Sequence, residues 1–514
     1  MVIVILGILA AVVVFAVSGV GDKGKASAVT IDERTIRTAE EAYCGQSGRY
    51  GSGQELVTAG LLSELPKYHQ VGALNTGGNC NGWNYTILKT PQAGTYPQGS
   101  WQSIASPPFA GNWTVNELHR LPNGQVLGMF FQTPALLTAI WDPATGAWTQ
   151  KDSSTSPNNP QNTFPNQSQN NPGAGQTYSS IVLRDDPATP ASECGSNCGK
   201  VLVHLRGSCP VPFNPACRPW WIFDSNAPTT TQWQPITLDA SFEPSFLYQA
   251  GAIRLPIPQF KTNCGANCGK VLVTSQDGGR RGYAFFDPRV NGAAAFSASF
   301  SYPAAVDPFQ FETYTLLPDG RVSLVGLDEN TSDPGAFLFD PSTNTWTTDT
   351  TPPFMPGTSF GFNSPSRILP TGQVLLAGIS GDFGAPFILR HFLYTPVANS
   401  PGTWTPVSSG CYTDEPAPAA FGPPFCQALS SLPDGRVLVH GTNDFSRSSG
   451  GDYTGKVFAF DPVTQQFSLV ADPANPVFFD TVTLDPRFGA CGNYCGKVLA
   501  VGNQTAGTTQ LYTP

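Results

Sequence analysis

Charged side chains are scarce in this 514-residue chain. Asp, Glu, Lys and Arg together make up 12% of it, against roughly 25% in an ordinary globular domain. The formal net charge is −9, and no Lys/Arg run interrupts the acidic balance. The basic surface that nucleic-acid binding requires is therefore missing, and we expect no nucleic-acid partner.

Several catalytic signatures are also absent. The sequence contains no Gly-Lys-Ser/Thr phosphate loop, no His-Glu-x-x-His zinc motif and no Gly-x-Ser-x-Gly nucleophile elbow. None of its five histidines pairs with a tyrosine after about residue 98, as the ligands of a copper radical oxidase would: His69, His119, His204, His391 and His440. We therefore expect no cofactor, no metal site, no catalytic residue and no enzymatic activity.

Glycine and proline are abundant, at 53 and 48 residues, and hydrophobic residues make up 40% of the chain. Many turn residues between short apolar stretches favour an all-β body over a helical one. The length exceeds that of a usual single-core domain, so two domains or one large closed array of repeats are expected.

One unit recurs seven times from about residue 98 onward. Each unit first shows a turn glycine followed by an apolar strand such as VLV. An aromatic residue comes next, followed in most units by Asp-Pro or Thr-Pro. A Trp or Phe in a later strand is the third feature. The seven glycines are spaced 51 to 75 residues apart: Gly124, Gly199, Gly269, Gly320, Gly372, Gly435 and Gly496.

Each unit predicts a four-stranded antiparallel blade, in which the VLV strand is buried on both faces. The repeat resembles the kelch and galactose-oxidase-like propellers, which implies a mainly β fold with seven blades over residues 100–514. The seventh unit reaches only its third strand at the C-terminus. We expect Ser100–Ile104 to supply the missing strand, because closure removes the free sheet edge.

Residues 1–17 form an uncharged apolar run, MVIVILGILAAVVVFAV. As a helix it would span about 26 Å, just short of a typical hydrocarbon core. An apolar stripe through Ile36, Ala39 and Tyr43 continues the helical period, so one long helix fits both halves. A cleaved signal, whose basic flank is missing, and a plain signal anchor are the alternatives. The expected assembly side chains are Val2, Ile3, Ile5, Leu6, Ile8, Leu9, Val12, Val13 and Phe15.

Four features follow in order: an acidic–basic stretch ending near Tyr43, Gly-Arg-Tyr at 48–50, a short helix near 54–62, and Leu65-Pro66. With the apolar run, residues 1–90 resemble type IV pilins and type II secretion pseudopilins. The resemblance implies packing with itself or other pilins, an inner-membrane anchor before assembly, and an extracellular cell-surface filament. The family's leader, processing site and acidic residue would precede this sequence, so we expect a truncated or miscalled start.

Twelve cysteines fall into six pairs of near neighbours in sequence: Cys44 with Cys80, Cys194 with Cys198, Cys209 with Cys217, Cys264 with Cys268, Cys411 with Cys426, and Cys491 with Cys495. Three pairs form Cys-x-x-x-Cys directly before a VLV-type strand. Two sulfurs in each loop, on different blades, do not readily make a four-coordinate metal site. Six disulfides are therefore predicted, which favours export to an oxidising compartment.

The expected organisation is a pilin-like helix and small globular segment (1–90), a linker (91–99) and the propeller. Two functional hypotheses follow. The first is a structural subunit of a pilus-like filament that displays the propeller for adhesion or surface binding. The second is a singly anchored cell-surface propeller that binds a glycan or protein, or acts as an extracytoplasmic enzyme. Because a mere tether would not need the segment 31–66, the sequence favours the filament.

Overall fold

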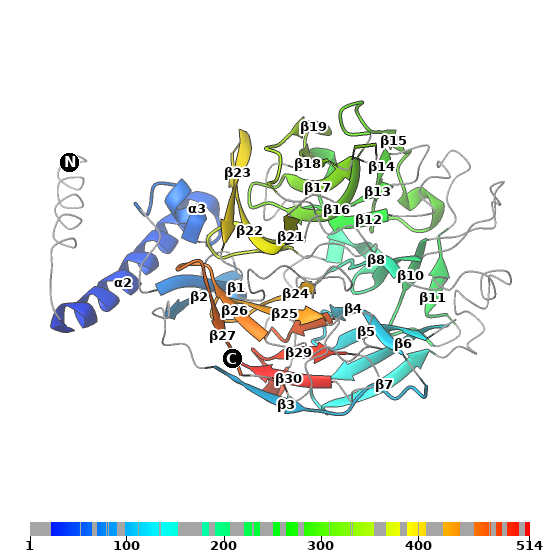
Figure 1. Ribbon diagram of the computed structural model, residues 1–514, viewed down its shortest axis with the longest axis horizontal. Helices are drawn as coiled ribbons and strands as arrows, with labels where there is room; N and C mark the ends of the chain where they lie inside the picture. The colour runs from blue at the N-terminus through cyan, green and yellow to red at the C-terminus, as the bar shows by residue number, and fades with distance from the viewer. Residues whose placement is uncertain are drawn as a thin grey trace. The chain divides into compact units, whose positions relative to one another are not determined.

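The protein is described by a computed structural model that divides into two compact units, Met1–Tyr96 with Pro433–Gly435, and Pro97–Leu432 with Arg436–Pro514 (Figure 1). The described residues are 22–51, 53–63, 69–78, 80, 82–89, 98–111, 113–132, 135–152, 177–184, 191–205, 220–228, 231–236, 250–256, 264–275, 282–307, 309–328, 330–331, 333–353, 366–380, 388–398, 400–407, 425–442, 457–471, 473, 480–485, 491–502 and 509–514.

The first unit contains two helices and a two-stranded antiparallel sheet, α2 (Asp22–Ser47), α3 (Gly53–Thr58), β1 (His69–Gly78) and β2 (Gly82–Lys89). Ile36 and Ala39 on α2 pack with Leu56, Leu62 and Val71, and a disulfide joins Cys44 to Cys80. The small core therefore forms between the helices and the sheet.

The expected long pilin-like helix is not what the structure describes. Its described helix begins at Asp22; Gly19 and Gly21 precede it in the sequence, and glycine is a poor helix former. The nine assembly side chains between Val2 and Phe15 lie outside the described residues. No helix in the described part of the chain is both long and apolar enough to cross a membrane.

Glu40 on α2 is fully buried in this unit. One of its carboxylate oxygens accepts a hydrogen bond from the Gly51 N–H at 2.8 Å, whereas the other, Oε1, has no hydrogen-bond partner. Burial raises the pKa of the Glu40 carboxyl from 4.5 to about 7. The uncharged form is therefore the one that suits the fold.

Replacing Glu40 by glutamine is expected to stabilise the first unit above neutral pH. A raised folded-state pKa gives a stability that is complete below about pH 4.5 and is lost as pH rises through about 7. The loss is about 3 kcal/mol at most. Protection of the α2 amides against hydrogen exchange should fall with rising pH in this window in the wild type and not in Glu40→Gln. Glu33→Gln, on the same helix, is the control, and retained pH dependence in Glu40→Gln would refute this account.

Within its described residues, the second unit contains seven four-stranded antiparallel sheets, which follow one another around a ring (Figure 1). Blades 1 to 3 consist of β4 (Thr114–Arg120), β5 (Val126–Gln132), β6 (Ala135–Asp142), β7 (Ala147–Asp152); β8 (Thr177–Val182), β9 (Val201–Leu205), β10 (Trp220–Phe223), β11 (Trp233–Pro235); and β12 (Ala250–Arg254), β13 (Val271–Ser275), β14 (Gly282–Phe286), β15 (Phe300–Ser301).

Blades 4 to 7 complete the ring and confirm the predicted seven-bladed propeller. They consist of β16 (Phe309–Leu316), β17 (Val322–Asp328), β18 (Pro334–Asp340), β19 (Thr345–Thr348); β20 (Ser366–Ile368), β21 (Val374–Ser380), β22 (Ile388–Val397), β23 (Ser400–Val407); β24 (Phe425–Ser431), β25 (Val437–Thr442), β26 (Val457–Asp461), β27 (Gln466–Leu469); and β28 (Asp480–Thr483), β29 (Val498–Val501), β30 (Thr509–Thr513), β3 (Ser100–Ser103).

The hydrophobic core lies between neighbouring blades. Leu127 and Ile140 of blade 1, for example, pack with Val201 and Trp221 of blade 2. All four residues of β29 are buried, as predicted for a strand packed on both faces. The burial of the VLV-type strands thus explains why they read as continuous apolar runs.

All seven turn glycines have positive φ angles, between 75° and 93°. This left-handed region is open to glycine at little steric cost, and each glycine belongs to the turn between the first and second strands of a blade. In every blade, a leucine before that turn donates its N–H to the carbonyl of the residue after the glycine, at 2.8 to 2.9 Å. These leucines are Leu121, Leu183, Leu255, Leu317, Leu369, Leu432 and Leu484.

The fourth strand of blade 7 comes from the other end of the propeller sequence. β3 pairs antiparallel with β30, and Trp101 lies opposite Tyr512 with ring centroids 4.9 Å apart. The Trp101 indole N–H also donates to the Ala471 carbonyl, at 2.7 Å. β3 therefore covers an edge of blade 7 that would otherwise be open.

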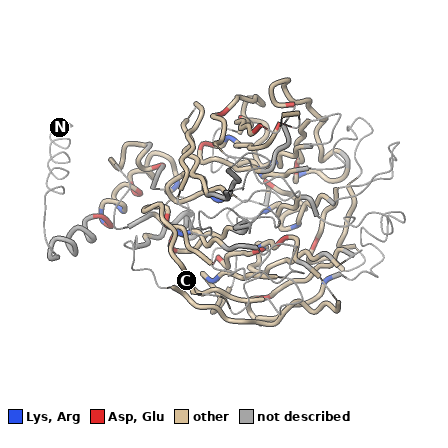
Figure 2. The backbone as a smooth tube through the Cα atoms, viewed as in Figure 1, with Lys and Arg blue, Asp and Glu red and all other residues tan. Residues whose placement is uncertain are grey.

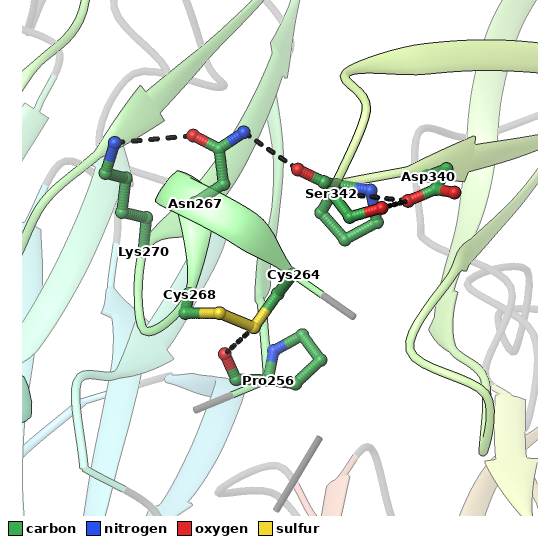
Figure 3. Close-up of a disulfide and its surroundings, with 8 residues drawn as sticks. Pro256, Cys264, Asn267, Cys268, Lys270, Asp340 and Ser342 are labelled. Carbon is green, nitrogen blue, oxygen red and sulfur yellow. Dashed lines mark hydrogen bonds between the residues drawn. A yellow bond between two sulfur atoms is a disulfide. The ribbon is translucent and has the colours of Figure 1, made fainter. Parts of the chain in front are cut away.

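Two of the Cys-x-x-x-Cys loops join blades as well as closing on themselves. In blade 3, a disulfide links Cys264 to Cys268, and Asn267 between them donates to the Pro341 carbonyl of blade 4 at 2.9 Å (Figure 3). In blade 2, Asn197 donates to the Pro288 carbonyl of blade 3, also at 2.9 Å. Both loops thus dock against the turn that joins the third and fourth strands of the next blade.

Replacing Asn267 by alanine is expected to lower the free energy of unfolding by about 1–3 kcal/mol, because the Pro341 carbonyl loses its donor. Chemical denaturation measures this. Replacing Asn226 by alanine is the control, because Asn226 is exposed and its backbone N–H, which alanine keeps, bonds to Asp224. Equal stability of the two variants would contradict the docking role of the loop.

Candidate functional site

Charged residues are sparse along the propeller (Figure 2), so their position on the innermost strands is informative. The first strands of neighbouring blades lie beside one another around the whole ring, β4 beside β8 and so on to β28 beside β4. These inner strands therefore surround the ring axis.

Two carboxyl groups occupy equivalent positions on adjacent inner strands. Glu117 in β4 and Asp480 in β28 each stand four residues before the leucine that precedes the turn. The described residues at the same position in four other blades carry no charge: Ser179, Gly251, Thr313 and Ala428. The pair is thus a feature of blades 1 and 7.

Asp480 is held by two backbone hydrogen bonds. Its carboxylate accepts the Leu118 N–H at 2.6 Å and the Thr481 N–H at 2.7 Å. Burial nevertheless raises the pKa of the Asp480 carboxyl from 3.8 to about 6, with a smaller raising effect from the charge of Glu117. The two hydrogen bonds and His119 act in the opposite direction. Asp480 can therefore hold a proton in mildly acidic solution.

Glu117, His119 and Ser180 form a hydrogen-bonded group between blades 1 and 2. Alternate residues of a strand point to the same side, so Glu117 and His119 both face β8. His119 Nε2 lies 3.2 Å from the Glu117 carboxylate and 2.5 Å from Ser180 Oγ, and the Ser180 hydroxyl also donates to Glu117. The His119 and Glu117 side chains are 14% and 26% exposed.

This group is not arranged as a nucleophilic triad. In a triad, the imidazole uses one nitrogen for the carboxylate and the other for the serine. Here the same nitrogen, Nε2 of His119, lies within reach of both Glu117 and Ser180. The arrangement suits proton transfer and hydroxyl binding better than the activation of Ser180 as a nucleophile.

Two other hydrogen bonds between blades have the same register as His119–Ser180. Thr315 pairs with Ser366 at 2.7 Å, and Ser430 pairs with Thr481 at 2.6 Å. Polar pairs at this position therefore tie inner strands together. Only the contact between blades 1 and 2 uses ionisable groups among these three.

Arg367 in β20 occupies the same strand position as His119. Its guanidinium donates to the Ser366 carbonyl at 2.8 Å. Burial lowers the pKa of Arg367, and the charge of Asp480 opposes this effect. Because β24 separates β20 from β28 in the ring, Arg367 and Asp480 influence each other across blade 6. We call Glu117, His119, Ser180, Arg367 and Asp480 the axial cluster.

The members of the axial cluster stand two to four residues before the leucine of each turn. The cluster therefore lies close to the turns between the first and second strands of the blades.

No motif in the sequence indicates this cluster, because its residues come from blades 1, 2, 5 and 7. The available signal is an alignment of the seven units on the leucine before the turn. That alignment places Glu117 and Asp480 where other blades have small or hydroxyl residues. The spacing of residues within a single unit does not indicate the axial cluster.

Four of the six predicted disulfides lie among the described residues and are confirmed: Cys44–Cys80, Cys194–Cys198, Cys264–Cys268 and Cys491–Cys495. The other four cysteines, Cys209 with Cys217 and Cys411 with Cys426, lie outside the described residues. The bridge between Cys209 and Cys217 and the bridge between Cys411 and Cys426 therefore stay predictions.

Among the residues that the structure describes, no three His, Cys, Asp or Glu side chains are grouped to hold a metal ion; the expectation of no metal site stays a prediction. His204 is fully buried against Trp220, with ring centroids 4.7 Å apart, which fits a structural histidine.

No protein-family model matches the sequence, and no curated protein matches it. Three solved structures illustrate the similarities. An ulvan lyase of polysaccharide lyase family PL25 is 11% identical with a TM-score of 0.42, over 74% of this chain and 89% of its own. The Dos1 propeller is 11% identical with a TM-score of 0.38, over 86% and 92%. The GH74 xyloglucanase from Xanthomonas campestris is 13% identical with a TM-score of 0.43, over 79% and 52%.

The expectation that the chain has no enzymatic activity needs correction. The ulvan lyase, the xyloglucanase and a puromycin hydrolase, which is 13% identical with a TM-score of 0.33 over 74% of this chain and 58% of its own, are enzymes that share structural similarity with it. A propeller can host catalytic and non-catalytic proteins alike, because function lies in the site and not in the fold. The absence of familiar catalytic motifs does not justify an expectation of inactivity, because a propeller can assemble a site from several blades.

Proposed function

We propose that the chain is an extracytoplasmic propeller that binds a polysaccharide at the axial cluster and acts on it by proton transfer. The observation that carries the proposal is the carboxyl pair: Asp480, with a pKa near 6, stands beside Glu117 on adjacent inner strands. The structural similarities, all with TM-scores below 0.5, do not carry it.

The chemistry follows from the unequal surroundings of the two carboxyl groups. Asp480 holds its proton below about pH 6, which is the state a general acid needs. Glu117 lies in a network with Ser180 and His119, through which a proton can be accepted. Paired groups in different environments are the usual way to divide acid and base roles.

A sugar polymer suits the compartment in which the chain is expected. The disulfides favour an oxidising compartment outside the cytosol. A polysaccharide is a substrate that an exported protein can meet there.

Incubating the purified chain with a panel of neutral, uronate-containing and sulfated polysaccharides tests the proposal. Affinity electrophoresis reports binding, and size-exclusion chromatography reports chain shortening. Retardation and shortening that both weaken in the Glu117→Gln variant would support the proposal. Absence of binding across the panel would overturn it.

Display on a filament is the second candidate. The observation that favours it is the first unit, where α2 packs on a small disulfide-linked domain, because a plain tether needs no such domain. In this account, residues 1–17 would pack with other pilins, and the kelch-like repeat would present its ligand site outside the cell. Filaments sheared from cells and identified by peptide mass spectrometry test it; filaments without this chain would refute it.

A further inference from the structure

Arg367 differs from the other arginines of the propeller whose ion pairs the structure shows. Arg120 pairs with Asp485 at 3.7 Å, and Arg289 and Arg321 each pair with a nearby aspartate at 2.7 Å. Arg367 instead donates to the Ser366 carbonyl. No carboxylate among the described residues lies within ion-pair distance of it, although Asp480 is close enough to affect it electrostatically.

We infer that the polysaccharide bound at the axial cluster is anionic and that Arg367 binds its carboxylate or sulfate group. This inference rests on the proposed function and names the class of substrate. Arg367 is half-buried, and a partly desolvated cation is stabilised by a paired anion. A ligand anion would supply the pairing that the described residues do not supply.

The guanidinium is suited to this contact. It carries five N–H donors in a planar fork, and the structure shows one of them in use, on the Ser366 carbonyl. None of its nitrogen atoms is buried without a hydrogen-bond partner, so its remaining donors are accessible. Carboxylate and sulfate both offer pairs of oxygens that match such a fork, which lysine cannot reproduce.

Asp480 should couple to the bound anion. Because Asp480 is close enough to Arg367 to influence it electrostatically, a negative group bound to Arg367 favours the protonated form of Asp480, and binding must be tighter where that form prevails. The other charged or titratable groups near Asp480 are Glu117 and His119 on β4, and the intervening β24 (Phe425–Ser431) carries no charged residue. Affinity for an anionic sugar should therefore weaken as pH rises through about 6.

Isothermal titration calorimetry with three probes tests the inference: a neutral glucan oligosaccharide, an oligogalacturonate and a sulfated galactan oligosaccharide. We expect at least one anionic probe to bind about tenfold or more tightly than the neutral one, as a charge-assisted contact would give. Preference for oligogalacturonate would identify a carboxylate ligand, and preference for the galactan a sulfate. Arg367→Gln should remove the preference for the anionic probe, and Arg367→Lys should restore it in part.

Arg289→Gln is the matched control, because Arg289 lies on the turn between β14 and β15 and pairs with Asp287. Thermal unfolding of each variant shows whether the fold is retained. If the neutral probe binds as tightly as the anionic probes and Arg367→Gln changes nothing, the inference is wrong and the proposed function stands. If no probe binds the wild type, both are wrong.

Discussion

Replacing Asp480 by asparagine is expected to lower kcat/KM on the cleaved polysaccharide by about 100-fold or more, the usual contribution of a general acid or base. Asparagine keeps the size of the side chain and an oxygen for the Leu118 N–H, but it has no carboxyl proton to give. Asp480 is protonated below its pKa of about 6, so wild-type activity should fall as pH rises through this value. The variant should show no such step.

The pH profile separates a chemical role from a structural one. Asp287→Asn changes an aspartate on the turn of blade 3, which pairs with Arg289, and it should leave activity unchanged. A variant that merely loosened the ring would lose activity at every pH and would also unfold at a lower temperature. Equal activity of Asp480→Asn and the wild type at pH 5 would contradict the proposed proton donor.

Replacing Trp101 by alanine is expected to open the ring. The local loss of packing against Tyr512 should cost about 3 kcal/mol of unfolding free energy, as for other tryptophan truncations. Detachment of β3 from β30 should lower the unfolding free energy further, because only a short antiparallel pairing joins the two strands. Hydrogen exchange should rise throughout β30, and the exposed strand edge should promote self-association.

Trp404 provides a closely matched control in blade 5. It packs against Tyr394 at 4.7 Å and donates to the Thr350 carbonyl at 2.9 Å, as Trp101 does with Tyr512 and Ala471. Its strand, however, directly follows β22 in the same blade. Trp404→Ala should therefore lose the packing energy without exposing an edge. Identical unfolding and exchange in the two variants would show that β3 does not close the ring.

The propeller could be predicted from sequence because its determinants are local and repeated. Each turn glycine requires a left-handed conformation, and each VLV-type strand is buried on both sides. Because the same pattern occurs seven times, it can be recognised even where a single unit departs from it. The disulfides of the short loops follow from local spacing for the same reason.

The axial cluster could not be predicted, because none of its five residues belongs to the pattern that the seven units repeat. Glu117 and Asp480 are 363 positions apart in the sequence and adjoin only because the ring closes on itself. The predicted closed ring places blade 7 beside blade 1, but the sequence does not show that burial raises the pKa of Asp480. His119, one of five histidines that matched no ligand pattern, gains its chemical setting from Ser180 on the next blade.

The expectation of enzymatic inactivity is wrong for a related reason. Motifs such as a phosphate loop or a nucleophile elbow report sites built from one segment. A ring of blades can place single residues from several segments around its axis. For a repeat protein, the positions at which a unit departs from its neighbours are therefore a better guide to function than the motifs of single-segment sites.

The most direct test of the central claim is a crystal structure of the chain with an acidic oligosaccharide selected from the binding panel. The account predicts that the sugar lies on the inner strands, with its anionic group on Arg367 and its hydroxyl or glycosidic oxygens within hydrogen-bonding distance of Asp480 and Glu117. A sugar bound elsewhere on the propeller, with the axial cluster unchanged, would contradict it.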